Sequence, residues 1–186
     1  YNDYIRADIP GLKVGTYALK IAAVKDGVEY LSSEVTGLQV KNYSREGFAH
    51  KDFSGVGAYN NDGTLKSGAV VIYVNKDNAK TVSAQLSSGK FTGLQAILNA
   101  YQKGNVTTPL AIRVLGLVKA GQTDTFESSA EGIQIKGRNA NSELNITIEG
   151  IGEDATIHGF GFLVRNAKSV EFRNLGRSEE RRVGKE

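Results

Sequence analysis

Two histidines are the first candidates for chemistry in this chain. His50 and His158 are the only histidines among the 186 residues, and neither has a histidine four residues away, as a helical metal site would need. A general base must lie within hydrogen-bond reach of the proton that it removes, and the two histidines occupy unrelated stretches of sequence. We expect both to be ordinary surface or turn residues.

Two pairs of acidic residues are the next candidates. Asp124 with Glu127, and Glu153 with Asp154, carry side chains that can bind calcium or transfer a proton. Both pairs lie in polar sequence typical of loops, where acidic side chains are usually solvated. We therefore assign no catalytic residue, no cofactor-binding residue and no metal ligand in this chain.

Gly159, Phe160 and Gly161 form a fragment of a glycine-rich motif. A nucleotide-binding motif needs a third glycine between a strand and a helix, so we expect these glycines to make a tight corner instead. The aromatic rings of Phe160, Phe162 and Phe172 could stack on sugars, but stacking on one another in the core is the favoured interpretation.

Composition narrows the class of protein without deciding its function. The chain has 22 glycines, two prolines and no cysteine, which suits turn-rich β-structure and excludes disulfides and cysteine-based metal sites. The net charge of +3 is too small to indicate a nucleic-acid-binding protein. No apolar run reaches the length of about 18 residues that a transmembrane helix needs.

The elements that must position these residues are indicated by a repeat. Residues 146–152 (ITIEGIG) and 170–176 (VEFRNLG) share one apolar–polar pattern at a shift of 24 residues, which is typical of a solenoid. Residues 161–165 (GFLVR) predict a second strand in the same repeat. The shift also makes Glu149 and Arg173 neighbours, which we expect to form an exposed pair on the outer face.

The same pattern occurs earlier, in residues 112–118 (IRVLGLV), which align with residues 146–152 at a shift of 34 residues. The extra length indicates an insertion, and residues 132–136 (GIQIK) within it predict one more strand. Short strands with insertions favour a parallel β-helix. A leucine-rich repeat is disfavoured, because its regular Leu and Asn framework is absent.

Two further elements are expected before this repeat. Residues 69–74 (AVVIYV) are a nearly continuous apolar run, which predicts a strand buried on both faces. Apolar residues at positions 94, 97, 98 and 101 predict an amphipathic helix of about three turns, with Thr92 as its N-cap and Gly104 at its end. Such a helix would cover the unpaired end of the solenoid.

Residues 68–176 together resemble the N-terminal part of a pectate lyase, a polysaccharide lyase with a right-handed parallel β-helix fold. The resemblance is carried by AVVIYV, GLQAILNAYQKGN, PLAIRVLG and above all by residues 144–176. It implies an all-β fold: a truncated right-handed parallel β-helix with one N-terminal capping helix.

The resemblance also implies the function. The parent protein would be an extracellular or cell-surface enzyme that cleaves polygalacturonate, the backbone of pectin, by calcium-assisted β-elimination. Its calcium ligands and its proton-abstracting Arg would follow Gly176, so this chain alone is predicted to be inactive. A non-catalytic β-helix adhesin and a carbohydrate-binding module remain as alternatives.

The first residues indicate a different unit. Residues 12–24 (LKVGTYALKIAAV) alternate as a strand with a tyrosine near its start, and Leu38 and Val40 end a later strand. This stretch resembles the end of a fibronectin type III-like module, where a conserved tyrosine turns a corner. A partial immunoglobulin-like sandwich that begins in mid-domain is therefore expected before the β-helix.

The last ten residues, 177–186 (RSEERRVGKE), have no apolar period and resemble the in-frame translation of a common sequencing adapter. They are interpreted as a foreign, disordered tail and excluded from fold reasoning. The predicted organisation is thus a fibronectin III-like end over residues 1–48, a linker over 49–67, the β-helix part over 68–176, and the tail over 177–186.

Overall fold

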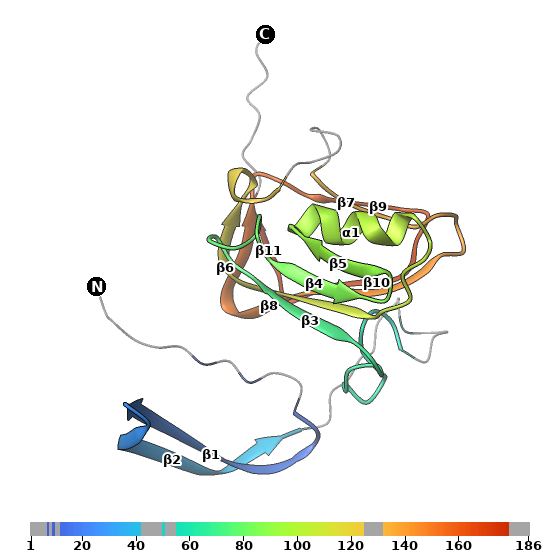
Figure 1. The fold of residues 1–186 in the computed structure, drawn as a ribbon. Coiled ribbons are helices and arrows are strands. Elements are labelled where there is room, and N and C mark those ends of the chain that lie inside the picture. Colours follow the sequence, from blue (N-terminus) through green and yellow to red (C-terminus); the bar gives the residue numbers. More distant parts are fainter. Residues whose placement is uncertain are drawn as a thin grey trace.

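The computed structural model describes residues 7, 9, 12–41, 50, 55–124 and 132–178. These residues form a mostly β structure that contains parallel sheets and one α-helix (Figure 1). The strands are β1 (Gly15–Lys25), β2 (Val28–Val40), β3 (Val70–Val74), β4 (Ser83–Leu86), β5 (Gly89–Thr92), β6 (Leu110–Lys119), β7 (Ile133–Lys136), β8 (Glu143–His158), β9 (Phe162–Arg165), β10 (Lys168–Arg173) and β11 (Gly176–Ser178); the helix is α1 (Leu94–Gln102).

The largest sheet has the order β10-β8-β6-β3, with β11 paired to the far end of β8, and all its strands are parallel. Within it Phe172 lies beside Ile148, and Arg173 lies beside Glu149. This register confirms the predicted shift of 24 residues. The opposite edge of the sheet is β3, as expected for the strand that opens the repeat.

The predicted shift of 34 residues between β6 and β8 is wrong. Ile112 pairs with Ile148, so the shift is 36 residues. Strand side chains alternate with a period of 2, so a slip of two residues keeps every apolar side chain on the same face. The apolar pattern alone cannot distinguish registers that differ by two residues.

A second, two-stranded parallel sheet faces the first. Strand β7 pairs with β9, with Ile133 beside Phe162, which confirms the strands predicted within 132–136 and 161–165. The core lies between the two sheets and α1, and its fully buried members include Ile112, Ile146 and Ile148 from the large sheet, Ile133 and Ile135 from β7, and Ile97 and Leu98 from α1.

Helix α1 begins and ends within the predicted bounds, but its N-cap was predicted incorrectly. Thr92 ends β5 and its hydroxyl lies 2.8 Å from that of Ser83. The free N–H groups of Gln95 and Ala96 instead donate to the carboxylate of Asp124, at 2.8 and 3.0 Å. A carboxylate suits this position because it satisfies exposed amides and opposes the positive end of the helix dipole.

Strand β3 differs from its prediction in burial. Ile72 and Val74 are buried, whereas the ring of Tyr73 is 43% exposed. The strand therefore buries one face only, because its other face lies on the outside of the sheet. The hairpin of β4 and β5, which leads into α1, was not predicted.

The N-terminal hairpin of β1 and β2 pairs with no other strand in the described part of the chain. The hydroxyl of Tyr17 donates to the carbonyl oxygen of Lys13 at 2.8 Å. Pairing places Ile21, Leu31 and Val35 on the same face as Tyr17, and all three remain more than half exposed. The hairpin thus has an apolar face that is not packed against a second layer.

Two boundaries from the sequence shift in the structure. Arg177 and Ser178, the first residues of the predicted tail, extend β11, where Ser178 pairs with His158; residues 179–186 lie outside the described residues. Residues 55–67, assigned to a linker, pack on the large sheet. Of the helices in the described ranges, none has the length and apolar character needed to cross a membrane.

Candidate functional site

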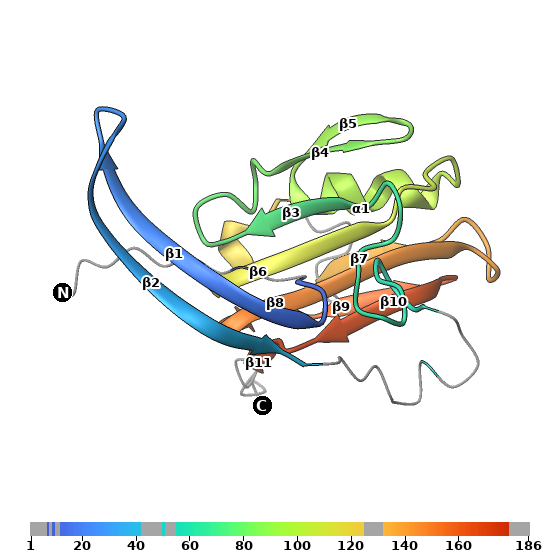
Figure 2. The same ribbon diagram turned by 90° about the horizontal axis from the view of Figure 1, so that it is seen from below.

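The outer face of the large sheet carries a row of polar side chains, one from each strand. The row runs from Tyr73 of β3 through Arg113 of β6 and Glu149 of β8 to Arg173 of β10. Arg113 Nε donates to Glu149 Oε1 at 3.0 Å, and Arg113 Nη1 donates to Tyr73 Oη at 2.9 Å. Figure 2 shows the four strands side by side.

The predicted neighbours Glu149 and Arg173 do lie beside each other, with Arg173 Nε 4.0 Å from Glu149 Oε2. Their predicted exposure is wrong, however, because Glu149 is buried. Its principal cation is Arg113, a third residue from the preceding strand, which the sequence pattern did not indicate as its partner. The pair belongs to a buried network and not to a solvated surface.

The network is covered by residues 55–67, which we call the strap. Tyr59 of the strap is buried, its hydroxyl donates to Glu149 Oε1, and Arg113 Nη2 donates to Tyr59 Oη at 3.1 Å. The guanidinium carbon of Arg173 lies 5.9 Å from the centre of the Tyr59 ring. The strap therefore supplies the residue that completes this network.

Backbone groups of the strap are anchored as well. Gly57 N–H donates to Ser169 Oγ at 3.0 Å, and Ala58 N–H donates to Thr147 Oγ1 at 2.9 Å. Gly57 has a φ of +72°, and a Cβ at this position would collide with the Thr147 side chain. Only glycine fits here without strain. The strap thus approaches the sheet too closely to act as a free linker.

Burial and hydrogen bonding fix the ionisation of this network. Burial, reinforced by the carboxylate of Glu149, raises the pKa of Tyr59 to about 12. Burial alone would lower the pKa of Arg113, but its hydrogen bonds to Tyr59, Glu149 and Tyr73 outweigh this and the pKa is raised. At neutral pH Tyr59 is therefore a neutral donor and Arg113 is a cation. Neither can act as a general acid or base near that pH.

The carboxylates of this face also do not fit a calcium site. Glu149 is bonded to Arg113 and Tyr59, and Glu171 accepts a hydrogen bond from Thr147 Oγ1 at 2.9 Å. Calcium needs six to eight oxygen ligands. Among the described residues, no group of three or more His, Asp or Glu side chains is placed to hold a metal ion.

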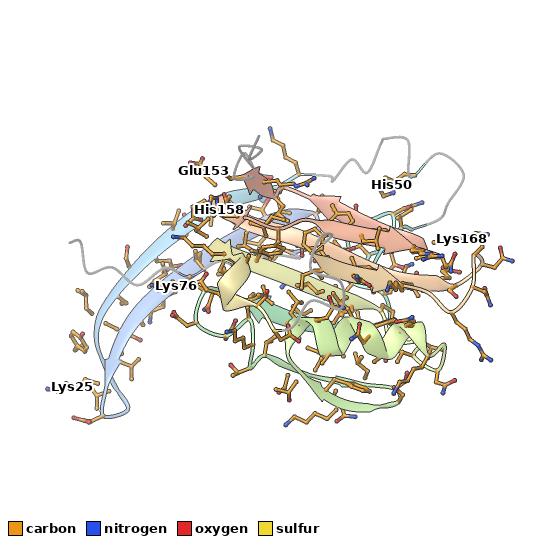
Figure 3. The ribbon with its side chains drawn as sticks, turned by 90° about the horizontal axis from the view of Figure 1, so that it is seen from above. Lys25, His50, Lys76, Glu153, His158 and Lys168 are labelled. Atoms are coloured by element: carbon orange, nitrogen blue, oxygen red, sulfur yellow. The ribbon has the colours of Figure 1, made fainter. Side chains whose placement is uncertain are left out.

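The two histidines lie apart from each other in Figure 3. His50 Nε2 is 3.5 Å from Glu171 Oε1, near the strap. His158, at the end of β8, has its Nδ1 3.2 Å from Ser178 Oγ. The structure therefore brings each histidine to a different partner and assembles no pair of them.

The acidic pairs take different places. Asp124 caps α1, as described above, and Glu127 lies outside the described residues. Glu153 and Asp154 are exposed, in a stretch of β8 between Ile151 and Thr156 where the pairing with β6 is interrupted. The expectation that these two side chains are solvated is confirmed, although they lie within the bounds of a strand.

The phenylalanines stack on one another, as favoured from the sequence. The ring centres of Phe160 and Phe162 are 6.0 Å apart in an edge-to-face arrangement, and those of Phe162 and Phe172 are 5.0 Å apart. Phe160 is buried, whereas Phe172 is 42% exposed. The glycines at 159 and 161 make the turn between β8 and β9, with Gly159 at a φ of +77°.

An open hollow of about 340 Å³ lies beside this aromatic cluster. Ile157, Phe162, Phe172 and Leu175 form its apolar part, and Arg173 and Arg177 line it as well. Its volume is at the lower end of the range for small-molecule pockets. Its apolar lining belongs to the last strands along the chain, so the hollow lies where the core reaches the surface.

The residue that sequence reasoning missed is Tyr59. A tyrosine in a glycine-rich, polar stretch (GVGAYNNDG) carries no periodic signal of burial. The only available indication was that the sheet needed a partner for the buried charges at Arg113 and Glu149, and burial itself was not predicted. Comparison of the chain with protein-family models, with curated proteins and with solved structures found no match.

Proposed function

We propose that this chain is the N-terminal part of a parallel β-helix polysaccharide lyase of the pectate lyase type. The single observation that supports this most is the register of the large sheet, in which successive strands place Ile112, Ile148 and Phe172 side by side. The parallel pairing of β7 with β9 supplies a second face. Successive turns of a parallel β-helix stack their strands in this way.

The likeness in motif supplies the chemistry of the proposal. Residues 144–176 occupy β8, β9 and β10, so the stretch with the strongest resemblance coincides with the strands that stack. On this proposal the complete protein cleaves polygalacturonate by β-elimination with bound calcium. The carboxylates described here are engaged by Arg113, by Thr147 or by the α1 amides, so we place the calcium ligands and the proton-abstracting Arg beyond residue 176.

The N-terminal hairpin fits the end of a fibronectin type III-like module. Its tyrosine hydroxyl bonds to a backbone carbonyl four residues upstream, as in the tyrosine corner of immunoglobulin-like sandwiches. Its apolar face, with Ile21 and Leu31 exposed, is suited to a second sheet, since a two-stranded hairpin is only marginally stable alone. We propose that this module precedes the lyase domain in a secreted or cell-surface protein.

The proposal is tested with the longer protein encoded by the same gene. Elimination creates a double bond conjugated to the uronate carboxylate, so its product absorbs ultraviolet light and a hydrolysis product does not. Calcium-dependent absorbance from polygalacturonate would support the lyase. Absence of cleavage by the longer protein would favour a non-catalytic β-helix instead.

A further inference from the structure

One corner of the structure is strongly basic. It is built from residues 102–105 at the end of α1, residues 136–143 between β7 and β8, and residues 165–168 between β9 and β10, all of which are described. These ranges hold five cationic side chains: Lys103, Lys136, Arg138, Arg165 and Lys168. We call this set the basic corner, and Figure 3 labels Lys168 within it.

Printed contacts bring the three segments together. Lys136 and Arg165 are partners in the parallel pair of β7 and β9, so their backbones are about 4.8 Å apart. A Cβ on Gly104 would lie 2.7 Å from Arg138 Cδ, which places Arg138 against the end of α1. Lys168 Nζ donates to Asn141 Oδ1 at 3.1 Å.

The charge of this corner is not balanced locally. Its three segments contain a single carboxylate, that of Glu143, which is the register partner of Lys168. Like charges on adjacent strands repel each other, so Lys136 beside Arg165 is a costly arrangement without an anion. Lys103, Arg138, Arg165 and Lys168 are exposed, so a ligand can reach them.

We propose that the basic corner binds a linear acidic polysaccharide. A uronate chain carries one carboxylate on each ring, and such a row can lie along Lys136 and Arg165, whose separation is set by the strand spacing. The corner also holds the amides of Asn139, Asn141 and Asn166, which can bond to sugar hydroxyls. The polymer would thereby neutralise the repulsion within the ladder.

A nucleic acid fits this corner less well. Proteins that bind single strands place aromatic side chains under the bases, and the three segments contain no Phe, Tyr or Trp. Double-stranded DNA is read by a helix or a two-stranded ribbon inserted in a groove, and this corner is made of turns. Charge with amides and without aromatic rings favours the acidic polysaccharide.

The inference rests on the class of polymer in the proposed function, but it requires no catalysis. It gives this chain a place to hold the polymer that is separate from the calcium-dependent chemistry expected beyond residue 176. The two claims are therefore measured separately, the first by binding to this chain and the second by elimination by the longer protein.

The test compares two variants of equal charge. Arg165→Gln with Lys168→Gln removes two cations from the basic corner, and Lys76→Gln with Lys80→Gln removes two exposed cations from the turn after β3. Figure 3 shows Lys76 at the opposite end of the molecule from Lys168. Calorimetry at low salt measures binding of polygalacturonate to the whole chain, and thermal melting confirms that each variant is folded.

The corner variant is expected to bind polygalacturonate about tenfold more weakly, since two exposed ion pairs together contribute about 1.4 kcal/mol. The control is expected to bind as the unmodified chain does, and fully methyl-esterified polymer, which lacks the charges, is expected not to bind. Equal weakening in both variants, no binding by the unmodified chain, or tighter binding of a single-stranded oligonucleotide would each overturn the inference. Binding without elimination by the longer protein would overturn only the proposed function.

Discussion

Gln95 of α1 forms two hydrogen bonds with the backbone of Gln134 in β7. The Gln134 N–H donates to Gln95 Oε1 at 2.8 Å, and Gln95 Nε2 donates to the Gln134 carbonyl oxygen at 3.0 Å. Ile133 N–H points the other way, to Gly161 in the turn before β9. A side-chain amide thus satisfies the edge that a neighbouring strand would otherwise pair, and α1 protects this sheet from further pairing.

Replacing Gln95 with Leu is expected to destabilise the fold. Leu preserves the apolar volume but leaves the N–H and C=O of Gln134 buried without partners, at a cost of about 2 to 3 kcal/mol in unfolding free energy. The control is Gln102→Leu, at the exposed end of the same helix. Urea denaturation followed by circular dichroism checks both; equal stability of the two variants would show that the amide bonds to Gln134 do not matter.

Breaking the buried network from one side should be costly. Arg113→Met leaves Glu149 buried with only the distant Arg173 as a cation, and the free energy of unfolding is expected to fall by about 3 kcal/mol. A double variant, Arg113→Met with Glu149→Leu, removes the uncompensated charge and should recover part of this loss. If the double variant is less stable than the single one by a further, additive amount, the two side chains are not coupled.

Tyr59 makes stability depend on pH in the alkaline range. Its pKa is raised from 10.0 to about 12 in the folded state, so folding favours the neutral phenol, and this contribution is present below pH 10 and lost as the pH rises towards 12. Tyr101, whose pKa is raised by burial, acts in the same direction. Urea unfolding across this range should show a smaller decline for Tyr59→Phe than for the unmodified chain. Identical declines would mean that Tyr59 does not titrate with folding.

The end of the chain offers a test of the predicted tail. Removing residues 179–186 is expected to leave the melting temperature unchanged, because this sequence has no apolar residue but Val183. Removing residues 176–186 should lower it, because Gly159 N–H donates to the Ser178 carbonyl oxygen at 3.0 Å and β11 would be lost from the sheet. A drop of several degrees with the shorter deletion would contradict the interpretation of residues 179–186 as foreign.

The strands and their inward faces could be predicted because apolar residues recur with a period of 2. Residues 146–152 and 170–176 share an uninterrupted spacing, so their register followed directly. The register of β6 did not, because the irregular stretch after Ile151 and the insertion before β8 change the spacing without changing the pattern. A periodic pattern fixes which face a residue occupies and leaves the pairing free by steps of two.

The contacts of the outer face could not be predicted for a different reason. Tyr59 and Asp124 act on elements far along the chain, the first on Glu149 and the second on α1. Both belong to polar stretches without periodicity, whose position depends on the tertiary fold. Local rules therefore favoured Thr92 as the helix cap and an exposed pair for Glu149, and the folded chain provided other partners.

The most direct test of the central claim is ultraviolet absorbance during incubation with polygalacturonate. The longer protein of the same gene is predicted to generate the absorbing unsaturated product, to lose this activity when a chelator removes calcium, and to work best at alkaline pH. The chain of 186 residues is predicted to generate none. Activity in this chain would show that the site lies before Gly176, and chelator-insensitive cleavage by the longer protein without absorbance would contradict the lyase assignment itself.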